Sequence, residues 1–159
     1  MNRAEAAQDT AGLRGIERSL PLALLKAREA AMSHFRPMLR AHGLTEQQWR
    51  VIRILAAFPD IDASEIVQRS YLLAPSLTRI LHYLESEKII TRKPDETDLR
   101  RSYFSLTPKG RRIYMRVAPD SESIYEQMSA RFGRDKLAQL YELLAEFANL
   151  GPESDDLTD

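Results

Sequence analysis

Three arginines lie where a protein could touch a nucleic acid: Arg79 in the first half of a predicted helix, and Arg100 and Arg101 in the loop of a predicted hairpin. A guanidinium group is planar and permanently charged, and it donates paired hydrogen bonds to a phosphate or to a guanine edge. A helix fits the major groove of B-form DNA, and an arginine-tipped loop fits the narrower minor groove. The order helix, strand, charged loop, strand across residues 75–110 therefore predicts a reader of duplex DNA.

The N-terminal half of the predicted recognition helix should read the DNA sequence. A helix N-terminus carries partial positive charge and free N–H groups, which favour a nearby phosphate. Hydroxyl groups bond phosphates or base edges, and Arg79 is the candidate for a bidentate guanine contact. The alternative for each residue is an ordinary exposed side chain. We expect the DNA-contacting residues of this helix to be Pro75, Ser76, Thr78, Arg79 and His82.

The predicted hairpin loop, or wing, should make the second contact. Arg100 or Arg101 is expected to enter the minor groove, where narrowing at A·T-rich sequence deepens the negative potential. The alternative is a solvated turn. Arg92 and Lys93, which precede the loop, are expected to contact phosphates or to lie on the surface.

The composition places the chain among soluble globular proteins, with 43% hydrophobic and 29% charged residues in a length of 159. That length is enough for one domain with a core. The absence of cysteine excludes disulfides, zinc-finger or iron–sulfur ligation and thiol redox sensing. We expect no membrane segment, no secretory signal and no metal or other cofactor, and a cytoplasmic location.

The formal net charge is zero, but its distribution is uneven. Residues 79–112 hold nine basic and five acidic side chains, a local net charge of +4. The last nine residues hold four acidic side chains and no basic one, a local net charge of −4. An acidic tail thus hides a basic region in the total, which is typical of a nucleic-acid-binding chain.

The elements that must position the arginines are mostly helical. Apolar periodicity and capping residues predict helices over about 21–42, 45–59, 62–69, 75–84, 109–132 and 133–151, and strands over 89–93 and 103–106. Residues 60–62 are expected to be a short extended link. Pro37 should kink the first helix, and Pro119 should bend or interrupt the fifth.

These elements predict a mainly α fold with a small β-hairpin (α+β): a winged helix-turn-helix with N- and C-terminal dimerisation helices. The expected organisation is a flexible N-terminal arm (1–19), one winged-helix DNA-binding and dimerisation domain (20–150) and an acidic disordered tail (151–159).

The outer helices carry apolar faces beyond the need of a small winged core: Leu20, Leu24, Leu25, Met128, Phe132, Leu137, Leu140, Leu144 and Phe147. One winged module buries little DNA surface, so a single copy binds weakly. A homodimer supplies two readers for half-sites about one helical turn apart, which implies a near-palindromic operator. The alternative is that these helices fold back on their own domain.

The helix, the wing with its sequence Asp98-Leu99-Arg100-Arg101 and the segment Leu-Thr-Pro-Lys-Gly at 106–110 resemble the MarR family of winged-helix transcription regulators. The resemblance covers roughly residues 20–150, and residues 19–55 are similar to the family's repressors of homoprotocatechuate and 4-hydroxyphenylacetate degradation. It implies dimerisation, and it implies that Asp98 pairs with an arginine and holds the wing shape. One departure is Lys88 where the family often has glycine. A left-handed backbone there would cost about 1 kcal/mol.

Arg28 lies on the apolar face of the first predicted helix, where a buried guanidinium needs either a protein carboxylate or an anionic ligand. Trp49 and Arg53 lie one turn apart on the next helix, and His34 could line a cleft with them. An aromatic carboxylate would suit this group, and the family resemblance suggests a phenolic or phenylacetic acid. The alternatives are a core Trp49, an interhelical ion pair at Arg28 and a surface His34.

Three functions compete. The first is a dimeric DNA-binding regulator, a repressor released from its operator by a small aromatic acid. The second is an enzyme, but the chain has only three histidines and none of the metalloprotease, P-loop, nucleophile-elbow or dinucleotide motifs, so we expect no enzymatic activity. The third is a winged-helix protein-interaction module without ligand sensing, against which the basic helix and wing argue.

Overall fold

The computed structural model describes residues 15–98 and 100–151. Leu99, most of the predicted arm (1–19) and nearly all of the predicted acidic tail (151–159) lie outside the described residues. At the described end of the arm, Ile16–Arg18 forms a short 3₁₀ helix, η2, directly before the first α-helix. This end of the predicted flexible arm is therefore helical.

Six α-helices and a three-stranded antiparallel sheet make up the described chain, which confirms the predicted mainly α winged fold. In order they are α1 (Leu20–Ala41), α2 (Glu46–Ala57), β1 (Ile61–Asp62), α3 (Ala63–Ser70), α4 (Ala74–Ser86), β2 (Ile90–Pro94), β3 (Ser102–Leu106), α5 (Pro108–Phe132) and α6 (Arg134–Ala148).

Strand β1 was not predicted as a strand. Residues 60–62 were expected to be an extended link, but Ile61 pairs with Phe104 and Asp62 with Tyr103, so the sheet order is β1-β3-β2. Two residues are too few to show a period-2 pattern, and the pairing depends on a partner strand far along the chain. The consequence is that β1 ties the start of α3 to the inner strand of the wing.

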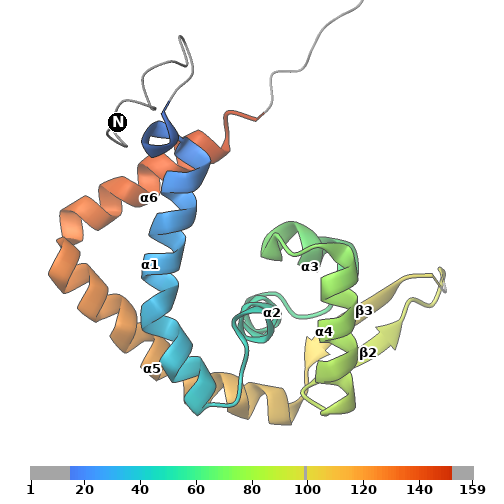
Figure 1. The fold of residues 1–159 in the computed structure, drawn as a ribbon. Helices are drawn as coiled ribbons and strands as arrows, with labels where there is room; N and C mark the ends of the chain where they lie inside the picture. Colours follow the sequence, from blue (N-terminus) through green and yellow to red (C-terminus); the bar gives the residue numbers. More distant parts are fainter. Residues whose placement is uncertain (1–14, 99, 152–159) are drawn as a thin grey trace, which may run out of the picture.

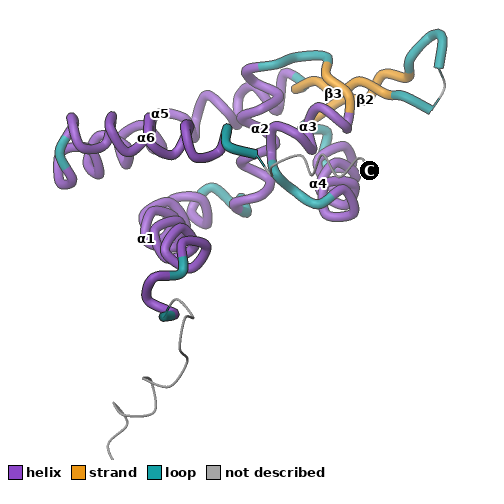
Figure 2. Tube along the Cα trace, turned by 90° about the horizontal axis from the view of Figure 1, so that it is seen from above, coloured by secondary structure: helices purple, strands orange, loops and turns teal. Residues whose placement is uncertain are grey.

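The chain forms two lobes. Helices α2, α3 and α4 and the sheet make one lobe, from which the β2–β3 hairpin extends (Figure 1). Helices α1, α5 and α6 make the other, with α5 and α6 along one side and α1 apart from them when seen from above (Figure 2). Because α5 contacts β3 and α2 as well as α1 and α6, it connects the two lobes.

The two internal prolines do not end their helices. Pro37 lies inside α1, and Pro119 lies inside α5, which continues to Phe132. Figure 1 shows α5 changing direction along its length, so of the two outcomes expected at Pro119, bending is the one observed.

Lys88 has a left-handed backbone, with φ 57°, just after α4. The N–H of Ile89 donates to the carbonyl of Leu84 at 2.8 Å, which closes α4 in the manner usual for glycine at this position. The Thr107 hydroxyl donates to the Lys88 carbonyl at 2.7 Å. The strain expected of a non-glycine residue is therefore present, and the start of α5 holds the turn from the other side.

Candidate nucleic-acid interface and adjoining pocket

Helix α4 buries one side and presents the predicted contact residues on the other. The buried side consists of Leu77, Ile80, Leu81 and Leu84. Of the predicted contacts, Ser76 is half-buried and the exposed ones are Pro75, Thr78, Arg79 and His82. The N-cap residue Leu73 offers no side-chain acceptor, so the first N–H groups of α4 remain open to an external anion.

Asp95 holds the wing loop together. Its carboxylate accepts the hydroxyl and the N–H of Thr97, both at 2.7 Å, the N–H of Asp98 at 2.9 Å and the hydroxyl of Tyr103 at 3.0 Å. These donors, the Thr97 hydroxyl first, hold the pKa of Asp95 far below its ordinary value. The resulting stabilisation is present above the ordinary aspartate pKa and is lost as the pH falls through the lowered one. An aspartate two residues before a threonine is the local signal that could have revealed this turn.

The prediction that Asp98 pairs with an arginine was wrong. Its carboxylate accepts the backbone N–H of Arg100 at 3.0 Å, so its role is structural but local to the loop. The carboxylate that binds a guanidinium is Asp62, whose Oδ2 accepts Nη2 of Arg101 at 2.5 Å. Sequence reasoning missed Asp62 because only the pairing of β1 with β3 brings it beside the wing.

Asp62 joins the wing to α3. Besides Arg101, its carboxylate accepts the N–H of Glu65 at 2.9 Å and so caps α3. The Glu65 N–H first, and then the Arg101 guanidinium, lower the pKa of Asp62. Arg101 therefore anchors the wing in the free chain. Arg100 is exposed on the same loop.

A small hollow of about 150 Å³ lies between the start of α3 and the wing. Arg92, Arg100 and Arg101 line it together with Asp62 and the first-turn residues Ala63 and Ser64. Because the Asp62 carboxylate pairs with Arg101 and caps α3, the positive charge of this hollow is partly neutralised within the chain itself.

Replacing Arg101 by alanine should raise the pKa of Asp62 toward, but not up to, its ordinary value, because the Glu65 N–H still caps the carboxylate. The amides of residues 95–101 should exchange hydrogen roughly 2- to 5-fold faster, which corresponds to the loss of a partly exposed ion pair. NMR titration of the carboxyl and hydrogen exchange measure both effects. Arg100→Ala is the matched control, and an unchanged Asp62 titration in Arg101→Ala would contradict the anchoring role.

A second site lies at the junction of the lobes, where α1, α2, α3 and α5 enclose a cavity of about 400 Å³. Its aromatic walls are Phe35, Trp49, Phe58 and Tyr125, and its charged residues are Glu46, Arg50, Arg53 and Arg69. Two of the predicted ligand-binding residues, Trp49 and Arg53, therefore line one cavity. Tyr125 was missed because it is 72 residues from Arg53 in the chain.

Arg53 is the cavity-lining arginine with a free carboxylate-binding edge. Its Nη1 donates to the Tyr125 hydroxyl at 3.2 Å. Arg50 pairs with Glu46 at 2.9 Å, and Arg69 pairs with a carboxylate of its own helix. Within residues 15–98 and 100–151, Arg53 makes no ion pair. With three arginines and one glutamate, the cavity favours an anion.

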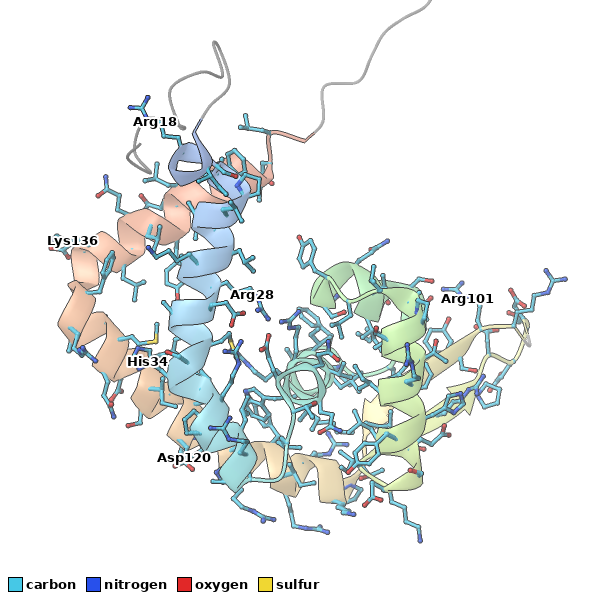
Figure 3. The ribbon with its side chains drawn as sticks, viewed as in Figure 1. Arg18, Arg28, His34, Arg101, Asp120 and Lys136 are labelled. Carbon is cyan, nitrogen blue, oxygen red and sulfur yellow. The ribbon has the colours of Figure 1, made fainter. Side chains whose placement is uncertain are left out.

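Arg28 and His34 do not line this cavity. Arg28 was expected to be buried, but its side chain is 45% exposed and pairs with Glu29 at 2.8 Å and with Glu46 of α2. The interhelical ion pair left open as an alternative is therefore what forms. His34 is exposed, and Figure 3 shows it on a different side of α1 from Arg28, which faces α2. The error arose because apolar neighbours on a helix face do not show what covers that face.

The helical lobe exposes the apolar faces expected of a dimer. No residue of α6 is buried in the single chain. The large apolar residues exposed on the helices of this lobe are Leu20, Leu22, Leu25, Met115, Phe132, Leu140, Tyr141, Leu143, Leu144 and Phe147. Patches of this kind on a soluble chain mark interaction surfaces. No helix within the described ranges is both long and apolar enough to cross a bilayer.

The chain is similar to known proteins over most of its length. A family model described as the MarR family matches residues 42–101. The homoprotocatechuate degradative operon repressor of Escherichia coli is 47% identical over 133 residues, covering 84% of this chain and 90% of that protein. The crystal structure of the transcriptional regulator PA4135 matches with a TM-score of 0.80 at 47% identity, covering 84% of this chain and 98% of that chain. That of NadR in complex with 4-hydroxyphenylacetate matches with a TM-score of 0.74 at 35% identity, covering 86% and 96%.

These matches span both lobes, including the helix and wing that carry the exposed arginines. They make the protein a DNA-binding transcription regulator rather than an enzyme. Because it is 47% identical to a family repressor over 90% of that protein's length, the chain belongs to the MarR family of winged-helix transcription regulators.

Proposed function

We propose that the protein is a homodimeric repressor that leaves a near-palindromic operator when a small aromatic carboxylic acid binds between its lobes. Residues 20–150 act as one DNA-binding and dimerisation domain. In each subunit α4 reads the major groove through Pro75, Ser76, Thr78, Arg79 and His82, and Arg100 reaches the minor groove from a wing that Arg101 anchors. The observation that carries the ligand-sensing part is an Arg53 guanidinium that lines an aromatic cavity and pairs with no carboxylate of residues 15–98 and 100–151.

The cavity has the size and chemistry for such an acid. A volume of about 400 Å³ lies within the range of small-molecule pockets, roughly 300–1,000 Å³. The Phe35 and Tyr125 rings lie 4.8 Å apart between centroids and form one wall, against which an aromatic ring can pack. Arg53 and the Tyr125 hydroxyl supply the donors for a carboxylate. Two relatives support an aromatic carboxylic acid as the class of ligand. One is a homoprotocatechuate operon repressor, and the other was crystallised with 4-hydroxyphenylacetate.

Arg50 connects the cavity to the start of the recognition helix. Its Nη2 donates to Glu46 at 2.9 Å, and its Nη1 donates to the carbonyl of Ser70 at 2.9 Å. Ser70 is the last residue of α3, immediately before the turn into α4. A ligand that repositions Glu46 or Arg50 therefore acts on the α3–α4 turn. The dimer leaves the operator if the ligand binds more tightly to a conformation in which the spacing of the two recognition helices does not fit the operator.

The test uses an operator selected from a random duplex library by the wild-type protein. 4-Hydroxyphenylacetate should release the wild-type protein in fluorescence anisotropy, and 4-hydroxyphenylacetamide, which lacks the charge, should not. Arg53→Ala should raise the acid concentration needed for half-release by about 10- to 100-fold, the loss of a charge-assisted hydrogen bond. Its operator affinity without ligand should be unchanged.

Arg40→Ala is the matched control, because Arg40 is an exposed arginine of α1 outside the cavity lining. It should respond to the acid as the wild type does. Equal operator affinity with and without every catabolic aromatic acid tested would count against ligand sensing. Equal release of Arg53→Ala and wild type would remove Arg53 from the site.

A further inference from the structure

Two large apolar side chains lie fully in solvent beside the recognition helix. Tyr71 is 88% exposed and Leu73 is 77% exposed, the highest values among the large apolar residues described. Leu72 between them is buried. Most of the other exposed large apolar residues lie on α1, α5 and α6, where the dimer surface accounts for them. That surface does not account for Tyr71 and Leu73, which belong to the α3–α4 turn of the winged lobe.

The turn that presents these side chains is strained and well held. Tyr71 has φ 53° and ψ 29°, a left-handed conformation that favours glycine or asparagine over an aromatic residue. The N–H of Leu72 donates to the Ser70 hydroxyl at 3.2 Å, and Arg50 donates to the Ser70 carbonyl. The left-handed backbone of Tyr71 ends α3, with its N–H donating to the carbonyl of Val67 at 2.9 Å, but the bulky ring that it carries stays in solvent.

We propose that Tyr71 and Leu73 are non-ionic DNA contacts. The Tyr71 ring packs on a deoxyribose and its hydroxyl donates to the adjoining phosphate, while Leu73 contacts a thymine methyl group in the major groove. The argument for DNA as the occupant is continuity, since Leu73 is the N-cap of α4 and lies two residues before Pro75. The proposal rests on α4 being the reading helix of the proposed function.

Contacts of this kind differ from arginine contacts in a measurable way. A guanidinium that binds a phosphate releases counterions and so steepens the dependence of affinity on salt. A ring on a sugar or a leucine on a methyl group releases none. Loss of Tyr71 or Leu73 should therefore weaken binding at every salt concentration by the same factor.

The experiment measures thermal unfolding and operator affinity from 50 to 300 mM salt for Tyr71→Gly, Tyr71→Phe and Leu73→Ala. Tyr71→Gly should unfold about 2 °C higher, because the left-handed strain is relieved. It should nevertheless bind the selected operator about 10-fold more weakly, with an unchanged salt slope. Tyr71→Phe should bind the operator about 3-fold more weakly than the wild type, and this difference measures the hydroxyl contact alone. Leu73→Ala should lose preference for thymine at one operator position.

Lys88→Gly relieves the same backbone conformation at the other end of α4 and is the matched stability control. It should show the same rise in unfolding temperature, and any change in its affinity should come with a flatter salt slope.

Wild-type operator affinity in Tyr71→Gly overturns the proposal, as does a loss confined to low salt. A loss accompanied by dissociation of the dimer in sedimentation also overturns it, since the turn would then contact the partner subunit. If a wild-type dimer selects no operator, the placing of α4 as reader fails and the proposed contacts fail with it. If Arg79→Ala weakens binding and Tyr71→Gly does not, only the present inference fails.

Discussion

Alanine in place of Arg79 should weaken binding to the selected operator by about 10- to 100-fold, the value of one bidentate guanine contact of roughly 1–3 kcal/mol. Arg79 is exposed on the first half of α4, off its buried side, so folding should be unaffected. Fluorescence anisotropy measures the affinity. Repeating the operator selection with the variant should show relaxed preference at a single base pair per half-site.

Arg79→Lys separates base reading from phosphate binding. Lysine keeps the charge but not the fork of donors, so the variant should keep non-specific affinity and salt dependence while losing discrimination at the same base pair. If Arg79→Ala instead weakens binding equally on all sequences and lowers the salt slope by about one, Arg79 contacts a phosphate and the base-reading role is wrong.

Gly110→Ala should destabilise the fold by at least about 3 kcal/mol and lower the unfolding temperature by roughly 6–12 °C. A Cβ at this position would lie 2.1 Å from the carbonyl oxygen of Ile89 and 3.2 Å from its carbonyl carbon, both backbone atoms. The same oxygen accepts the Thr107 N–H at 3.0 Å, so it cannot move without breaking the contact between Ile89, just before β2, and the N-cap of α5. Circular dichroism or calorimetry measures the shift.

The direction of the change in stability distinguishes close packing at Gly110 from an ordinary helix position. At an ordinary helix position alanine stabilises by about 1 kcal/mol relative to glycine, whereas here the close approach to Ile89 reverses it. Gly43→Ala is the matched control: it has a left-handed φ of 69° but open space around it, and should cost only about 1 kcal/mol. Equal effects of the two substitutions would contradict the close packing at Gly110.

The wing shows where sequence reasoning succeeds and where it stops. Its position and its exposed Arg100 follow from local order along the chain. The carboxylate that anchors Arg101 does not, because Asp62 is 39 residues away and reaches the loop only through β1. Asp95 lay within reach of a local argument, since its contacts with Thr97 and Asp98 span three residues or fewer.

The cavity between the lobes shows the same division. Trp49 and Arg53 lie one turn apart on α2, and that spacing was enough to place them on a shared site. Burial of Arg28 was inferred from its apolar neighbours and failed, since the single chain leaves that face of α1 partly open. The pairing of Arg53 with Tyr125 depends on how α5 crosses α2, which no short-range pattern records.

The helices, the hairpin and the solvent-facing arginines could be predicted from the sequence, because helix periodicity and capping act over a few residues. The packing of the lobes sets which carboxylate meets which guanidinium, which side chains enclose the cavity and where a glycine cannot be replaced. Those contacts join residues that are distant in the chain, and their geometry exists only once the lobes have packed.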